Sequence, residues 1–172
     1  MKRLVIIGCG GSGKTLLANQ LAALYELPLT HLDAVYYDAE WNPLPTEEFE
    51  AEQRRLVAEQ RWLIEGNYAG TLPIRLARAE TVIFLDLPPI TCLYGIAQRR
   101  WRYRGGQHGD GVYDHITWNF IKYIWGYRKT MRPKVQGLLA EHGGNAHLHM
   151  LTSRRQAARY VRALQAEQST RT

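Results

Sequence analysis

The stretch GCGGSGKT, residues 8–15, follows the apolar run LVII directly and constrains this chain more than any other feature. It fits the pattern G-x-x-x-x-G-K-[S/T] in full. Glycines let a backbone turn with positive φ and bring its N–H groups close to an anion. Between a strand and a helix, such a loop forms a positive nest for phosphate oxygens. The motif therefore favours a nucleotide-binding loop over a simple strand-to-helix turn.

The residue types of this loop predict separate contacts with a nucleotide. Lys14 is expected to reach the β- and γ-phosphates of ATP, and Thr15 to offer its hydroxyl to Mg²⁺. ATP and Mg²⁺ are therefore the predicted cofactors. The predicted nucleotide-binding residues are Gly8, Gly10, Gly11, Ser12, Gly13, Lys14 and Thr15.

Strand and helix patterns alternate along the chain. Apolar periodicity predicts strands over 2–7, 29–33, 61–66, 81–86 and 145–151. It predicts helices over 14–24, 46–60, 88–104 and 116–138, the last bent or divided by Pro133, and a basic helix after Thr152 or Ser153. The alternation favours a three-layer α/β/α fold with a five-stranded parallel sheet. The length of 172 residues suits a single domain over 1–172.

Acidic residues end three of the predicted strands, where parallel sheets bind their ligands. Asp33 ends the second strand, and we favour a functional role for it over an Asx turn or a helix cap. Glu65 and Asp86 end the third and fourth strands. Either acid is suited to the Mg²⁺ side of a nucleotide site, and the residues alone leave both alternatives open.

Several segments behind the glycine loop form a familiar series: HLDAVYY, WLIEGNY, VIFLDLP and QRRWRYRG, in this order. From residue 3 to about 162, the chain resembles the adenylate-kinase-like P-loop proteins identified as DNA topology modulation proteins. The resemblance implies the fold of small nucleoside and metabolite kinases. It implies that Asp33 faces the phosphate acceptor, where it would orient a hydroxyl or accept its proton. It also favours Glu65 over Asp86 as the acid that holds water on Mg²⁺.

The same resemblance implies a lid near 99–115 that closes over ATP. Arg99 and Arg100 are predicted to contact the transferring phosphates, because guanidinium groups neutralise phosphoryl charge bidentately. A solvated basic helix end is the alternative. The chain has HGD at 108–110, where the family pattern leads us to expect R-P-D. One lid arginine is therefore missing, or its role has moved.

Other side chains receive weaker assignments. Arg75 and Arg78 are candidates for the acceptor side or for the surface, and Tyr36 and Trp41 for the wall of an acceptor pocket. The adenine ring is expected near 152–154. The two imidazoles of HLH, at 147–149, are expected to belong to a plain strand because no third metal ligand is in view.

The composition excludes some classes of protein but does not identify a single function. The net charge of +6 and the pI near 9.5 suit anionic partners such as nucleotides or nucleic acid. Two cysteines are too few for a disulfide framework, and no run is long enough for a transmembrane helix. The absence of a signal-peptide pattern leads us to expect a cytoplasmic location.

The sequence as a whole predicts a P-loop kinase. It would transfer the γ-phosphoryl group of ATP to a nucleoside, a nucleotide or a small metabolite. The predicted catalytic residues are Lys14, Asp33, Arg99 and Arg100, and the predicted metal-side residues are Thr15 and Glu65. The alternative is a nucleic-acid-associated NTP-binding protein whose basic surface holds phosphate backbone and which uses NTP as a switch.

Overall fold

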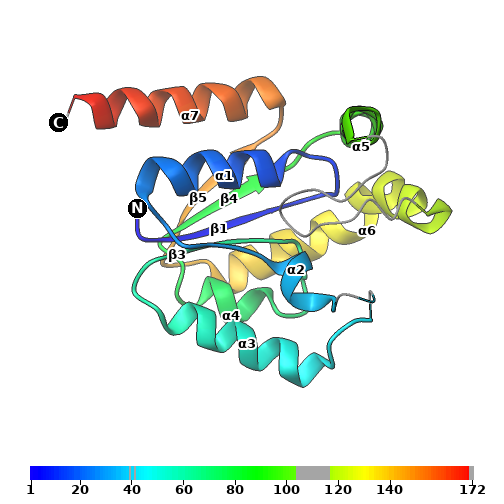
Figure 1. Cartoon of the computed structure of the whole chain (residues 1–172), viewed down its shortest axis with the longest axis horizontal. Coiled ribbons are helices and arrows are strands. Elements are labelled where there is room, and N and C mark those ends of the chain that lie inside the picture. Colours follow the sequence, from blue (N-terminus) through cyan, green and yellow to red (C-terminus); the bar gives the residue numbers. More distant parts are fainter. Residues whose placement is uncertain (39, 41, 104–116, 171–172) are drawn as a thin grey trace.

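A five-stranded parallel sheet forms the centre of the molecule, with strands in the order β2-β3-β1-β4-β5 (Figure 1). The computed structural model describes residues 1–38, 40, 42–103 and 117–170. The strands are β1 (Arg3–Gly8), β2 (Leu29–His31), β3 (Trp62–Glu65), β4 (Thr81–Leu85) and β5 (His147–Leu151). The helices are α1 (Lys14–Tyr25), α2 (Leu32–Tyr36), α3 (Thr46–Ala58), α4 (Leu72–Leu76), α5 (Pro89–Tyr103), α6 (Trp118–His142) and α7 (Arg154–Ser169).

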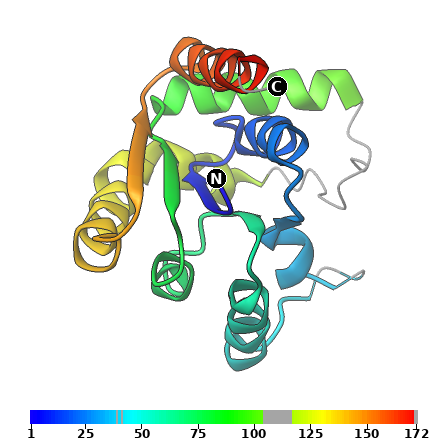
Figure 2. The same cartoon turned by 90° about the vertical axis from the view of Figure 1, so that its left-hand side faces the viewer.

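Helices cover both faces of this sheet. Helices α1, α5 and α7 lie on one face, and α3, α4 and α6 lie on the other (Figure 2). The central strand β1 is apolar along its whole length because both of its faces are covered, and Leu4, Val5, Ile6 and Ile7 are fully buried. The edge strand β5 is largely exposed. The predicted three-layer α/β/α fold with a five-stranded parallel sheet is confirmed.

The second strand is shorter than the sequence predicts. We expected it to run to Asp33, but β2 ends at His31, and Leu32 begins the short helix α2 with its side chain fully buried. Asp33 therefore lies in the first turn of a helix, close to the helix N-terminus, where a carboxylate is favoured. The short helix α4 is a second element that the periodicity did not predict.

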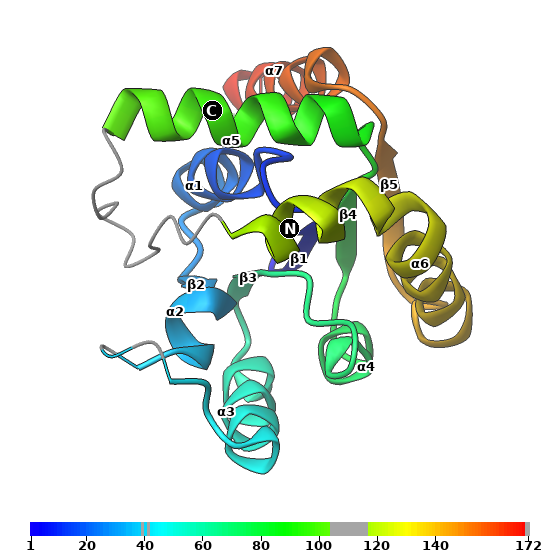
Figure 3. The ribbon, with the colours of Figure 1, turned by 90° about the vertical axis from the view of Figure 1, so that its right-hand side faces the viewer.

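Helix α6 stays in one piece. Pro133 lies inside it, and the helix continues to His142. It changes direction along its length, so the proline bends it without dividing it (Figure 3). No helix in the described part of the chain combines the length and apolar character needed to cross a membrane. Most of the predicted lid near 99–115, with His108 to Asp110, and Trp41 lie outside the described residues.

Candidate functional site

The carboxyl edge of the sheet gathers the residues that the sequence singles out. The glycine loop follows β1, Asp33 comes two residues after β2, Glu65 ends β3, and Asp86 follows β4. Because β1 lies between β3 and β4 in the sheet, the two acids flank the loop from either side. This edge is where ligands bind in doubly wound sheets.

The glycine loop is held in its curve by close backbone packing against α5. Gly11 has φ +74°, and a Cβ added there would lie 2.2 Å from the carbonyl oxygen of Cys92. A Cβ added at Gly95, in α5, would lie 2.2 Å from the carbonyl oxygen of Gly11. Gly13 has φ +94° and caps the N-terminus of α1. Helix α1 thus begins immediately behind the loop, and its free N–H groups point toward it.

Ser12 of the loop has a buried hydroxyl without a hydrogen-bond partner among the described residues. Ser12 is 3% exposed, and its Oγ makes no hydrogen bond to any described residue. A buried hydroxyl without a partner is costly unless a ligand or water satisfies it. The backbone curve, the helix N-terminus and this hydroxyl together fit an anion such as a nucleotide phosphate.

Glu65 connects the glycine loop to the end of β2. Its Oε1 lies 3.7 Å from the ammonium nitrogen of Lys14, and its Oε2 lies 3.4 Å from the hydroxyl of Thr15. His31 Nδ1 lies 2.9 Å from the same Oε2. Lys14 also donates a hydrogen bond of 3.2 Å to the carbonyl oxygen of Cys9. The side chains predicted for the metal side, Thr15 and Glu65, therefore lie in contact.

The surroundings of Glu65 keep it ionised. Burial by itself raises the pKa of a carboxyl, but the hydrogen bond with His31 and the charge of Lys14 outweigh this effect and hold the pKa of Glu65 below its usual range. A buried carboxylate beside a threonine hydroxyl is a donor set that Mg²⁺ accepts, because this ion takes one or two protein oxygens and completes its shell with phosphates and water.

Asp86, the other candidate acid, has a different partner. It is 2% exposed, and its Oδ2 accepts a hydrogen bond of 2.7 Å from Nε of Arg132, in α6. This ion pair fastens α6 to the end of β4. The contacts with the loop therefore support Glu65, and those with α6 give Asp86 a structural partner.

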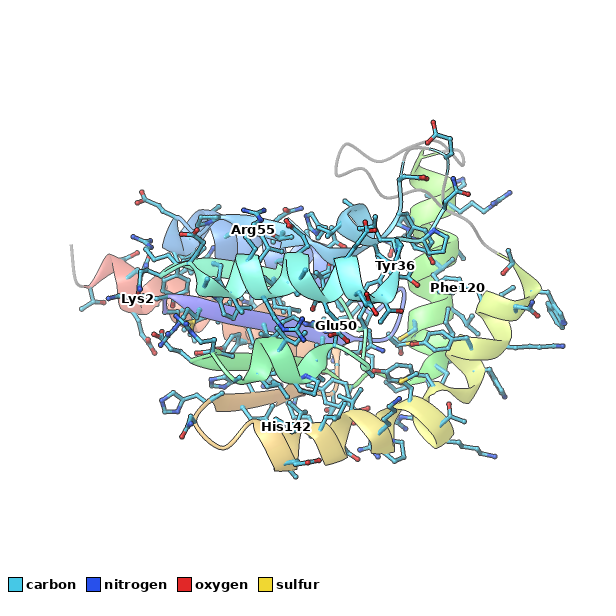
Figure 4. All side chains as sticks on the ribbon, turned by 90° about the horizontal axis from the view of Figure 1, so that it is seen from below. Lys2, Tyr36, Glu50, Arg55, Phe120 and His142 are labelled. Carbon is cyan, nitrogen blue, oxygen red and sulfur yellow. The ribbon has the colours of Figure 1, made fainter. Side chains whose placement is uncertain are left out.

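Asp33 lies beside a group of tyrosines. Its Oδ1 accepts a hydrogen bond of 2.7 Å from the hydroxyl of Tyr68. Burial and the Asp33 charge both raise the pKa of Tyr68, so this phenol stays protonated as the donor. Ring centroids 4.8–5.0 Å apart join the aromatic cluster, which we define as Tyr36, Tyr37, Phe49 and Tyr68. Tyr36 lies beside the first turn of α3 (Figure 4).

Arg75 is structural and is the largest fully buried side chain. Its guanidinium donates hydrogen bonds of 2.7 Å to the carbonyl of Gly66 and 2.9 Å to that of Tyr68. Of the two alternatives for Arg75, the surface position is wrong, since a hydrogen-bonded cation can be buried where an unpaired one cannot. Arg78 is exposed.

Helix α6 contacts the site from the other side of the sheet. A Cβ added at Gly10 would lie 2.6 Å from Cζ of Phe120, so this ring rests on the glycine loop. Asn67 donates a hydrogen bond to the hydroxyl of Tyr123 and accepts one from that of Tyr127, each 3.1 Å long. Tyr127 is buried, whereas Trp118 and Trp125 of the same helix are exposed.

The arginines of α5 lie beyond its contact with the loop. Cys92 and Ile96 face Gly11. Arg99 follows them at helical spacing on the same face and is partly buried. Arg100 is exposed. The roles predicted for both arginines stay predictions.

The end of β5 is joined to α5 and α7. Ser153 caps α7 by accepting a hydrogen bond from the N–H of Gln156, which settles the predicted choice between Thr152 and Ser153. Arg154 donates to the carbonyl of Thr91 and lies over the ring of Tyr94. His147 and His149 lie in strand β5.

Solved structures similar to this one are kinases. A shikimate kinase from Acinetobacter baumannii in complex with shikimate has a TM-score of 0.60 and 16% identity, over 99% of this chain and 94% of its own. A shikimate kinase from Bacteroides thetaiotaomicron has a TM-score of 0.53 and 17% identity, over 98% of both chains. A sugar kinase from Janibacter sp. HTCC2649 has a TM-score of 0.51 and 17% identity, over 99% of this chain and 93% of its own.

At these identities, the likeness shows a fold. The chain shares the three-layer α/β/α fold of these kinases. No protein-family model matches the chain, and no curated protein matches it in sequence. The resemblance to DNA topology modulation proteins is therefore not confirmed.

Four residues of the site escaped the sequence argument: His31, Asn67, Tyr68 and Phe120. His31 and Tyr68 stand next to quoted motifs, in HLD and EGNY, and their nearness to the acids was available as a signal. Asn67 and Phe120 act through contacts between segments more than fifty residues apart, and no local pattern predicts such a contact.

Proposed function

We propose that this protein is an ATP-dependent phosphotransferase that acts on a small hydroxyl-bearing acceptor. The observation that carries the proposal is the position of Glu65, in contact with both Lys14 and Thr15. It lies beside a glycine loop whose Ser12 hydroxyl has no hydrogen-bond partner in the described part of the chain. In this proposal, the loop binds the phosphates of ATP, and Lys14 turns from Glu65 and Cys9 toward their oxygens. Thr15 and Glu65 would hold Mg²⁺, which supplies positive charge to the phosphates.

The residues after β2 form the acceptor side. Asp33 orients the acceptor hydroxyl or accepts its proton, and Tyr68 holds the Asp33 carboxylate. Arg99 and Arg100 are proposed to neutralise phosphoryl charge from α5. Solved kinases of similar fold, two of them shikimate kinases and one a sugar kinase, support this class of reaction.

An acceptor screen tests the proposal. Purified protein with ATP and Mg²⁺ is assayed for ADP release with nucleosides, nucleotides, sugars and shikimate-like alcohols. We expect at least one acceptor to raise ADP release above background, and Lys14→Met to remove that increase. Lys129→Met, an exposed lysine of α6, is the control of equal charge change. Failure of every acceptor to raise ADP release would contradict the proposal.

The alternative role, a nucleic-acid-associated NTP-binding protein, has one supporting feature. Arg155, Arg159 and Arg162 are exposed at helical spacing on α7. Salt-dependent DNA binding that survives Lys14→Met and is lost on replacing these three arginines by glutamine would favour it. The Asp33 carboxylate held by Tyr68 on the proposed acceptor side favours the phosphotransferase.

A further inference from the structure

The charge of the acceptor side differs sharply from that of the nucleotide side. Between Lys14 and Arg54, the chain contains no lysine or arginine. The segment 32–53, which includes α2 and most of α3, instead carries Asp33, Asp38, Glu40, Glu47, Glu48, Glu50 and Glu52. Asp33 itself belongs to this acidic segment and is exposed.

The two arginines that follow this segment form ion pairs within α3. Arg54 and Arg55 form ion pairs with Glu50 and Glu52 on the same helix. In Figure 4, Arg55 lies on α3 between Tyr36 and Lys2.

Three further arginines lie in the chain between α3 and β4. Arg61 stands directly before β3 and donates to the carbonyl oxygens of Tyr25 and Glu26. Arg75 is buried and donates to two carbonyls of its own loop. Arg78 comes shortly before Thr81, the first residue of β4, at the edge of the sheet away from the loop. Within the described residues from 29 to 78, no guanidinium or ammonium group faces Asp33.

His31 does not supply the missing charge. Its Nδ1 contacts Oε2 of Glu65, a carboxylate that already faces Lys14. What the acceptor side offers is the carboxylate of Asp33 and the partly exposed rings of Tyr36, Tyr37 and Tyr68. Aromatic rings with hydroxyl groups bind flat or ring-shaped bodies, and a carboxylate binds a hydroxyl or an ammonium group.

We infer that the acceptor is a ring-shaped hydroxyl compound without a phosphate or carboxylate group, neutral or cationic in charge. This inference rests on the proposed phosphotransferase function. A phosphate or carboxylate placed beside Asp33 and the first turn of α3 would meet like charge, and no cation described between residues 29 and 78 faces it. A nucleoside or an amino sugar fits this side, and a nucleoside monophosphate or a ring carboxylic acid does not.

Matched acceptor pairs test the inference. Each pair differs by one anionic group: uridine and UMP, adenosine and AMP, glucosamine and glucosamine 6-phosphate, methyl shikimate and shikimate. ADP release with ATP and Mg²⁺ gives kcat/KM for every member. For the pairs that are turned over, we expect the member without the anion to be preferred by about tenfold or more. Added salt should reduce the ratio of kcat/KM between the two members of a pair, because it screens charge.

A charge-reversal variant separates electrostatics from shape. Glu47→Lys, exposed in the first turn of α3, should reduce the preference by about threefold through the added positive charge. Glu141→Lys, at the far end of α6, makes the same change in net charge and should leave the preference unchanged. Equal use or preference of the anionic members would overturn the inference and leave the phosphotransferase proposal standing. ADP release that no member of any pair raises would overturn both.

Discussion

The hydroxyl of Tyr68 donates a hydrogen bond of 2.7 Å to Asp33 and so joins the loop after β3 to the first turn of α2. We expect Tyr68→Phe to lower kcat by about tenfold, because the freed Asp33 carboxylate loses one orienting bond of about 1.5 kcal/mol. KM for ATP should stay unchanged, since Tyr68 is on the acceptor side. Steady-state ADP release measures both constants.

Tyr94→Phe is the matched control, because it removes the hydroxyl of an exposed tyrosine on α5. A wild-type kcat in Tyr68→Phe would show that Asp33 needs no such support.

Glu65 is expected to make the free energy of unfolding fall as the pH falls. Its pKa in the folded protein lies below the ordinary value of 4.5, so the unfolded chain takes up this proton first as the pH falls. The contribution of Glu65 to the free energy of unfolding is therefore present above pH 4.5 and is lost as the pH falls through its folded pKa. Glu65→Gln should flatten the decline in stability below about pH 5.

Urea denaturation at several pH values measures this effect. Glu47→Gln, on the exposed face of α3, is the control and should keep the wild-type decline. The same slope in Glu65→Gln and in the wild type would contradict the assignment of ion pairs around Glu65.

The sequence predicted the fold well wherever a local pattern decides the structure. The strand before the glycine loop, the helix behind it and the alternation of strands and helices all follow from short periodic segments. The end of β2 did not follow, because Asp33 was assigned to an extended strand while the burial of Leu32 turns the chain into α2. Tertiary burial therefore overrode a pattern only five residues long.

The residues in and beside the glycine loop could be predicted from the sequence, and the buried residues that hold the neighbouring loops could not. Lys14, Thr15 and Glu65 come together because parallel strands align their carboxyl ends, and this rule applies to any sequence with such strands. The burial of Arg75 was unpredictable from its neighbours. It depends on where the carbonyls of Gly66 and Tyr68 point after folding.

Gly11 is expected to tolerate no side chain. Gly11→Ala would place a methyl group 2.2 Å from a backbone oxygen of α5, at a φ of +74° that alanine rarely adopts. We expect a loss of about 2 kcal/mol or more in the free energy of unfolding, together with loss of ATP binding. Thermal unfolding and calorimetric titration with ATP measure the two effects.

Gly70→Ala offers the comparison, because a Cβ added at Gly70 meets no atom within 4 Å. This variant should keep both ATP binding and stability. A stable Gly11→Ala protein that binds ATP normally would show that the loop does not depend on this backbone contact.

Arg75 is expected to stabilise the fold more than any exposed arginine does. Arg75→Met removes the donor to two carbonyl oxygens in a buried loop, and should lower the free energy of unfolding by about 3 kcal/mol. Arg78→Met, three residues on and exposed, should change it by less than about 0.5 kcal/mol. Urea denaturation compares the two variants, and equal effects would refute a structural role for Arg75.

Helix α6 reaches three of the loops that follow the strands. Phe120 rests on Gly10, Tyr123 and Tyr127 hold Asn67, and Arg132 pairs with Asp86. All these anchors belong to one unbroken helix, so the regions proposed for donor and acceptor share a common scaffold. Strain imposed at one region is transmitted to the other, and we expect the two ligands to bind with energetic coupling rather than independently.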